Sequence, residues 1–121
     1  MKNLAQLRAI HAKEWAPNVK KGNGDGKPSA VAKKVPAQII QNGILGALAF
    51  ALEDNEGPLS VFKGVAQHFS LLKDDGFDFR VSATDPEKFF DQRIKEPDPA
   101  VLRAITTETM EYLNYLRRFV K

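Results

Sequence analysis

The chain has no cysteine among its 121 residues, and this absence excludes several kinds of chemistry together. A disulfide framework, a zinc site with thiolate ligands and a cysteine nucleophile all require this residue. Histidine is scarce too, since His11 and His68 are the only two in the sequence. Neither has a second ligand at the spacing of a metal site. We expect structural or surface roles for both histidines, and we predict no metal site and no cofactor.

The sequence also lacks long hydrophobic runs. Its longest uninterrupted stretch of apolar residues and glycine extends from Gly43 to Leu52, which is well short of the ~20 residues that a membrane-spanning helix requires. The first residues contain no continuous apolar segment of the kind that signal peptides carry. Together with the absence of cysteine, these features predict a cytoplasmic protein without a membrane partner.

Residues that could act together in catalysis are missing as well. Gly22, Gly24 and Gly26 alternate with polar residues between two lysines, but this spacing matches neither a P-loop nor a dinucleotide fingerprint. Asp74-Asp75 precedes a glycine without the ligand series and the closing glutamate of a calcium loop. We therefore predict that the chain is not an enzyme.

Charge is plentiful but unevenly distributed. The formal net charge is +3, yet residues 1–34 alone carry eight basic and two acidic side chains. A basic segment on a nearly balanced body is typical of proteins that bind polyanions. A solvated basic face without any partner is the alternative that this asymmetry leaves open.

The first third of the chain has the pattern of a helix followed by a loop. Apolar residues spaced by three to four positions predict an amphipathic helix over 2–15, and Pro17 ends it. The next segment is rich in glycine, asparagine and lysine, which predicts a flexible basic loop over 17–28. Ser29 is placed to cap the following helix, because its hydroxyl can accept a hydrogen bond from an N–H of the first turn.

The middle of the chain combines helical spacing with helix-breaking residues. Pro36 falls within a repeat of apolar residues every four positions, and it predicts a kink or a new helix start. Asn42-Gly43 predicts a helix stop, since both residues tolerate a left-handed backbone. The segment 44–52 is apolar nearly all round, so we expect a buried helix there. Pro58 predicts the first residue of the next helix.

The last part of the chain predicts an extended loop over 74–84 and two helices. The run at 84–87 has the signature of a capping box, with Thr84 as the cap of a short helix through Ile94, and Asp98-Pro99 repeats a cap-then-proline signal. A narrow apolar seam then predicts a long final helix, with Glu108 among the charged residues mainly off the seam. The seam consists of Leu102, Ile105, Thr109, Tyr112, Leu116 and Phe119. The chain is thus expected to be a single all-α domain over 1–121, a compact bundle of five to six helices with a long C-terminal helix.

Two clusters of basic residues are the candidates for contact with nucleic acid. A helix-turn-helix does not fit, because segment 44–52 has no side chain to reach base edges. Most aromatic residues fall on core stripes, so stacking platforms are not expected. Contacts with phosphates, independent of sequence, are the mode that the pattern favours. The candidate RNA-binding residues are Lys33 and Lys34 first, Arg117 and Arg118 second, and the loop residues Lys20, Lys21 and Lys27 last.

Two blocks of the sequence also resemble a known family. Residues 33–50 contain, in order, a lysine pair, a proline, an Asn-Gly break and an apolar helix. Residues 112–119 form an aromatic and apolar seam that ends in a basic pair and a phenylalanine. Both blocks resemble the small all-helical subunit of type III-B CRISPR effector (Cmr) complexes. The similarity extends over most of the chain and is weak in the loops at 18–27 and 75–84.

This resemblance implies a scaffold role. Such subunits have no nuclease activity of their own, and several copies stack beside the backbone subunits that hold the guide RNA. The implied partners are the other Cmr subunits, further copies of the same chain, and the duplex of guide and target RNA. Cleavage of target RNA would belong to an aspartate of the backbone subunit. The basic face, with Lys33 and Lys34 first, would line the RNA groove.

Two other classes of function fit the residues. A free-standing helical protein that binds nucleic acid would bind RNA or DNA well by itself, whereas a scaffold subunit would bind poorly until assembled. A protein–protein adaptor would keep its behaviour toward RNA unchanged when the charge of the basic face is reversed.

Overall fold

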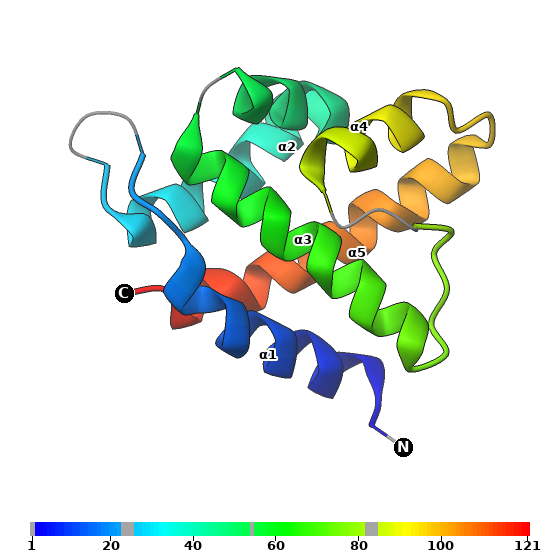
Figure 1. The fold of residues 1–121 in the computed structure, drawn as a ribbon, viewed down its shortest axis with the longest axis horizontal. Helices are drawn as coiled ribbons and strands as arrows, with labels where there is room; N and C mark the ends of the chain where they lie inside the picture. Colours follow the sequence, from blue (N-terminus) through cyan, green and yellow to red (C-terminus); the bar gives the residue numbers. More distant parts are fainter. Residues whose placement is uncertain (1, 23–25, 54, 82–84) are drawn as a thin grey trace.

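A computed structural model describes residues 2–22, 26–53, 55–81 and 85–121. Within these residues the chain forms five α-helices, one 3₁₀ helix and no strand (Figure 1). The elements in chain order are α1 (Leu4–Trp15), η1 (Ala16–Asn18), α2 (Pro28–Leu52), α3 (Glu56–Asp74), α4 (Pro86–Ile94) and α5 (Pro99–Phe119). The predicted all-α bundle with a long C-terminal helix is confirmed.

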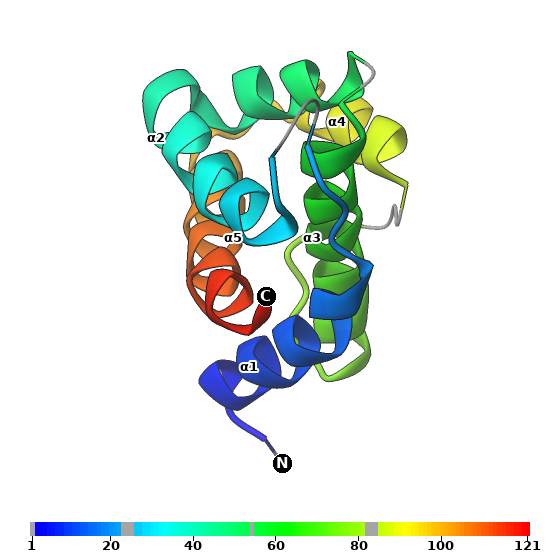
Figure 2. The same cartoon turned by 90° about the vertical axis from the view of Figure 1, so that its left-hand side faces the viewer.

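The helices pack around one hydrophobic core. α3 crosses in front of α5 in Figure 1, and α1 packs against both of them near one end. α2 packs against α3, α5 and α4, and its second half crosses the opposite end of the molecule from α1 (Figure 2). The start of α2 lies beside the end of α5, near the C-terminus (Figures 1 and 2).

Aromatic side chains fill the centre of this core. Phe62, Phe69, Phe89 and Tyr112 are each at most 1 % exposed. The ring of Phe69 lies 6.0 Å from that of Phe89 and packs edge-on against Phe79 at 5.3 Å. Burial of large apolar side chains provides most of the driving force for folding, so this cluster joins α3, α4 and α5 without any disulfide.

α2 changes direction at Gly43, not at Pro36. Gly43 has φ 74° and ψ 167°, whereas Pro36 lies within regular helix. The predicted kink or new helix start at Pro36 is wrong, because Gly43 is the residue of α2 that departs from helical angles. Proline's fixed φ is compatible with helix, although its ring crowds the preceding turn and removes one hydrogen bond. The predicted break at Asn42-Gly43 is confirmed, although Asn42 itself keeps helical angles. The backbone region that Gly43 occupies is accessible essentially to glycine alone.

The starts of α2 and α3 differ from their predicted positions. α2 begins at Pro28 after Lys27, so Ser29 lies inside the first turn and does not cap the helix. Proline takes the first helical position, where its missing N–H costs nothing. α3 begins at Glu56, two residues before the predicted start at Pro58. Pro58 still falls in the first turn, where N–H groups have no partner within the helix.

The starts of α4 and α5 use aspartate caps. The Asp85 carboxylate accepts a hydrogen bond from the Glu87 N–H at 2.9 Å, so Asp85 caps α4. Thr84, the predicted cap, lies outside the described residues. Asp98 caps α5 as predicted, accepting from the Ala100 N–H at 2.9 Å. The predicted extended loop is irregular backbone over its described part between α3 and α4.

By length and composition alone, α2 is apolar enough to cross a membrane. This is weak evidence, since the core helix of a globular protein passes the same test. Its buried residues include Val35, Ile39 and Leu48, and the helix packs against three others. The break at Gly43 further divides it into two shorter helical segments.

Candidate nucleic-acid interface

All seven predicted RNA-binding residues are exposed, but they occupy three different places in the fold. Lys20 and Lys21 follow η1, and Lys27 immediately precedes α2. The remaining four come from the second turn of α2 and the last turn of α5. These are Lys33, Lys34, Arg117 and Arg118.

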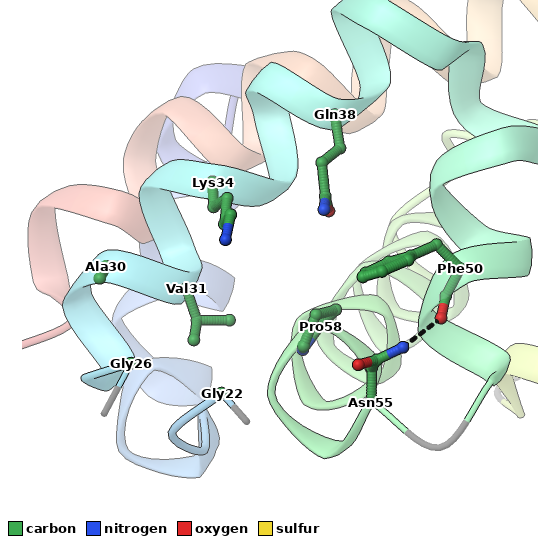
Figure 3. A pocket seen from close by; sticks show the side chains of 9 residues that line it. All are labelled: Gly22, Gly26, Ala30, Val31, Lys34, Gln38, Phe50, Asn55 and Pro58. Carbon is green, nitrogen blue, oxygen red and sulfur yellow. Dashed lines mark hydrogen bonds between the residues drawn. The ribbon is translucent and has the colours of Figure 1, made fainter. Parts of the chain in front are cut away.

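The lysine pair on α2 does not act as one charge cluster. Consecutive residues of an α-helix point about 100° apart. Lys34 lines a hollow, the Lys34 pocket, which lies between the first half of α2, the end of α2 and the start of α3 (Figure 3). Lys33 is exposed and is not among the residues that line it. Only one ammonium group of the pair therefore faces this pocket.

The arginine pair on α5 is divided in the same way. Arg118 lines a second hollow, the Arg118 hollow, together with Lys13 of α1 and Lys121. None of the described residues that line it is acidic. Cations at the C-terminus of a helix also interact favourably with its dipole, so Arg117 and Arg118 help to stabilise α5 as well.

Lys13 is a member of this surface that sequence patterns do not reveal. It lies more than 100 residues before Arg118 and joins it only because α1 packs against α5. Pro28 lines the same hollow, and Lys33 is five residues further along α2, a rise of about 7.5 Å. Five residues also turn the helix by about 140°, and neither Lys33 nor Lys34 lines this hollow, so the structure does not bring the two predicted clusters together in one site.

Backbone contacts hold the described part of the predicted flexible loop, which carries the three loop lysines. The Gly22 N–H donates to the Gly26 carbonyl at 2.8 Å. Gly57 of α3 packs so closely on this backbone that a Cβ there would lie 2.9 Å from the Gly22 Cα. Residues 23–25 lie outside the described part of the chain, so flexibility over 17–28 stays a prediction.

Lys20 differs from the other candidates because it already has a partner. Its Nζ lies 2.8 Å from the Glu56 carboxylate, and this hydrogen bond lowers the pKa of Glu56. Its backbone N–H donates to the Ser60 hydroxyl at 2.9 Å. An exposed ion pair is weak and screened by salt, so Lys20 can exchange Glu56 for phosphate.

A chain of buried polar side chains joins α1, α3 and α5. His11 Nδ1 lies 2.8 Å from His68 Nδ1, and His68 Nε2 lies 2.9 Å from Glu108 Oε2. Arg8 donates from Nη2 to Glu108 Oε1 at 2.6 Å and from Nε to Oε2 at 2.8 Å. Glu108 is 3 % exposed and His68 is fully buried. The prediction that Glu108 lies off the buried seam is therefore wrong.

The hydrogen-bond partners determine which ring nitrogens of His68 and His11 carry a proton. A carboxylate only accepts hydrogen bonds, so His68 donates from Nε2 to Glu108. A neutral His68 then accepts at Nδ1, and His11 donates to it. Burial lowers the pKa of His68, opposed by its bond to Glu108. Burial and the neighbouring His68 lower the pKa of His11.

This buried chain is structural in character. Burial raises the pKa of Glu108, but hydrogen bonds from Arg8 and His68 outweigh it and the net pKa is lowered. Each oxygen of the carboxylate accepts at least one hydrogen bond from another helix. Among the described residues, no group of three His, Cys, Asp or Glu side chains is arranged to hold a metal ion.

The fold and the surface describe a small all-helical protein with basic residues around two neighbouring hollows. The chain belongs to the Cmr5 family of CRISPR-associated proteins, because the family model matches residues 4–121. This family is the small subunit of type III-B complexes, so the chain is a subunit of a CRISPR Cmr complex. The resemblance inferred from the sequence is confirmed. No curated protein and no solved structure matches the chain.

Proposed function

We propose that this subunit is a non-catalytic scaffold that stacks along the backbone subunits of the Cmr complex and holds the RNA duplex through its basic side. The observation that carries the proposal is the Arg118 hollow, where Lys13, Arg118 and Lys121 meet without an acidic residue in the described lining. Cations that converge from distant parts of the sequence form a phosphate-binding surface, whereas scattered lysines serve solubility.

The proposed contacts are electrostatic and independent of RNA sequence. Lys33, Lys34 and Lys13 lie on helices, so their backbone positions are fixed relative to Arg118. Phosphate contacts of this kind position a nucleic acid without reading its bases. Target cleavage is left to another subunit, and the proposed location is the cytoplasm.

Charge reversal tests this proposal in the assembled complex. Lys33→Glu combined with Lys34→Glu, and Lys13→Glu combined with Arg118→Glu, should each weaken target RNA binding and reduce the salt dependence of the affinity. Each lost phosphate contact lowers the slope of log affinity against log salt by about one. Affinity measured at several salt concentrations provides both values.

The matched control is Lys88→Glu combined with Lys95→Glu, because these exposed residues at α4 line neither hollow. It changes the net charge by the same amount and should leave the slope near that of the unmodified complex. Equal effects of all three double variants would contradict a localised basic face. Unchanged RNA affinity in every variant would favour an adaptor, and tight RNA binding by the isolated chain would favour a free-standing RNA-binding protein.

A further inference from the structure

The Lys34 pocket differs from the other hollows in its size and in the groups on its walls. It has a volume of about 170 Å³. Ligand pockets for drug-sized molecules typically span about 300–1,000 Å³. A cavity of this size therefore accommodates one ring system or one side chain, and not a helix or a strand.

Its walls combine a flat aromatic surface, an amide and a cation. Lys34 and Gln38 extend into the pocket from α2, and the Phe50 ring extends toward them from the other half of the same helix (Figure 3). Val31 and Pro58 provide apolar walls. The break at Gly43 brings the two halves of α2 around this space.

Two of these groups are available for contact with a ligand, the ring of Phe50 and the amide oxygen of Gln38. Phe50 is 41 % exposed although the leucine and isoleucine residues of its helix segment are buried or half-buried, so its ring departs from the core packing expected for the aromatic residues. Gln38 Oε1 is buried and has no hydrogen-bond partner. A buried polar atom without a partner costs free energy, and a ligand with a complementary edge removes that cost.

The pocket also opens into a path for a longer molecule. A neighbouring hollow of about 450 Å³ shares Lys34, Gln38 and Phe50 with the pocket and adds the amide side chains of Gln41 and Asn42. Lys34 lies where the two hollows join. A flat ring in the pocket can therefore belong to a polymer whose backbone follows the larger hollow past this ammonium group.

We propose that the Lys34 pocket binds one unstacked nucleobase of the RNA, an inference that rests on the proposed function and deepens it. The base stacks on Phe50, its edge hydrogen-bonds to Gln38, and the attached phosphate lies at Lys34. Unstacked bases are the parts of RNA that proteins recognise by aromatic stacking and by hydrogen bonds to base edges. The subunit then contacts one nucleotide by its base as well as the RNA by its phosphates.

A side chain from a neighbouring subunit is the other occupant that fits by size. An apolar side chain would bury the Gln38 amide and the Lys34 ammonium without giving either a partner, which is costly. A nucleotide satisfies both, and its negative charge complements the lysine. The chemistry of the walls therefore favours the nucleotide.

Phe50→Leu in the assembled complex tests the proposal, because leucine keeps apolar bulk and removes the ring. We expect target RNA affinity about five- to tenfold lower, at the lower end of the effect of removing a stacking side chain. The slope of affinity against salt should not change. Phe50→Trp should restore or increase the affinity. Circular dichroism and recovery of the intact complex control for folding and assembly.

Target RNAs with a single abasic nucleotide, moved through the sequence one position at a time, identify the base. At a position whose base occupies the pocket of one copy, the difference in affinity between the complex with Phe50→Leu and the unmodified complex should be smaller than with intact RNA. A deficit of the same size at every position, or no deficit with intact RNA, would overturn the base pocket. Loss of the subunit from the complex with unchanged RNA affinity would assign the pocket to a protein side chain.

This test separates the two proposals. If the Lys33 and Lys34 charge reversals reduce the salt slope while Phe50→Leu has no effect, the basic face stands and the base pocket does not. If the charge reversals have no effect either, the proposed function itself is contradicted.

Discussion

The junction of α1, α3 and α5 and the Lys34 pocket both contain polar groups among apolar ones, yet they differ in how those groups are paired. At the junction, Glu108 accepts from Arg8 and His68, and His68 pairs with His11. In the pocket, Gln38 Oε1 has no partner. Among the described side chains of the junction, the hydroxyl of Tyr112, which stacks on His68, is the buried group without a partner. A buried network whose charged and imidazole groups are paired rigidifies a fold, whereas an unpaired amide oxygen beside an exposed ring suits a ligand.

The largest effect on stability is expected from Glu108→Gln at the junction. The amide keeps the shape of the carboxylate but removes its charge and replaces one acceptor oxygen by an NH₂ donor, so Arg8 and His68 can no longer both keep their hydrogen bonds. Breaking a buried ion pair from one side costs about 3–5 kcal/mol. Urea denaturation measures the change in the free energy of unfolding.

Glu111→Gln is the matched control for this variant. Glu111 lies one turn further along α5, and its side chain is 52 % exposed. Its distance to Arg8 is 3.9 Å, so the change should stay within about 1 kcal/mol. Similar losses of stability for both variants would mean that the buried pair of Arg8 and Glu108 contributes no more than an exposed ion pair does.

A smaller effect is expected from Gly43→Ala, which tests the break that shapes the pocket. A Cβ at Gly43 meets nothing within 4 Å, so any cost comes from its φ of 74° and not from a clash. A residue other than glycine in this region costs about 1–3 kcal/mol. Thermal unfolding measures the loss, and RNA affinity should fall as well if α2 straightens.

Asn42→Ala controls for the change of side chain next to this break, since Asn42 is exposed and helical. Its stability should change by less than about 0.5 kcal/mol, as is usual for surface substitutions. A Gly43→Ala protein as stable as the Asn42→Ala protein would show that α2 tolerates a different angle at this position.

The smallest effect is expected from pH, which changes protonation and removes no atom. The folded protein lowers the pKa of His11 and His68 from 6.5, so the unfolded chain binds more protons below that pH. Stability should therefore be fully present above pH 6.5 and decrease as the pH falls below it. Glu14 and Asp75 raise the pKa of His11 and oppose part of this loss.

Urea midpoints at pH 7.5 and 5.5 measure this dependence, and His11→Gln should reduce it because one of the two titrating groups is gone. The opposite sign, greater stability at the lower pH, would mean that the histidines are charged partners of Glu108 in the folded protein. That result would mean that the junction holds charged histidines and not neutral imidazoles beside the Arg8–Glu108 ion pair.

Local spacing predicts the helices of this protein better than it predicts their partners. The buried face of α5 follows from apolar residues at three- and four-residue intervals. Glu108 occupies such a position too, three residues after Ile105 and four before Tyr112, but a charged residue suggests exposure. Its partners Arg8 and His68 are 100 and 40 residues away in the sequence, so no local pattern reveals them.

The candidate interface shows the same limit. Lysine and arginine pairs are visible in the sequence, but which member of each pair lines a hollow depends on how α2 and α5 are rotated in the bundle. Lys13 lines the Arg118 hollow and Phe50 lines the Lys34 pocket only because of the tertiary packing. The helix break at Gly43 can be predicted from the sequence because the backbone preference of glycine is local. The exposure of Phe50 cannot, because it follows from the turn that Gly43 introduces.

Trp15 gives this molecule a built-in optical reporter. It is the only tryptophan of the chain, its indole N–H donates to the Ser60 carbonyl at 2.9 Å, and its ring lies directly over Gly64. Because this ring joins α1 to α3 and lines neither the Lys34 pocket nor the Arg118 hollow, its emission reports release of the first helix without a dye. Fluorescence can thus distinguish loosening of the scaffold from occupation of its surface.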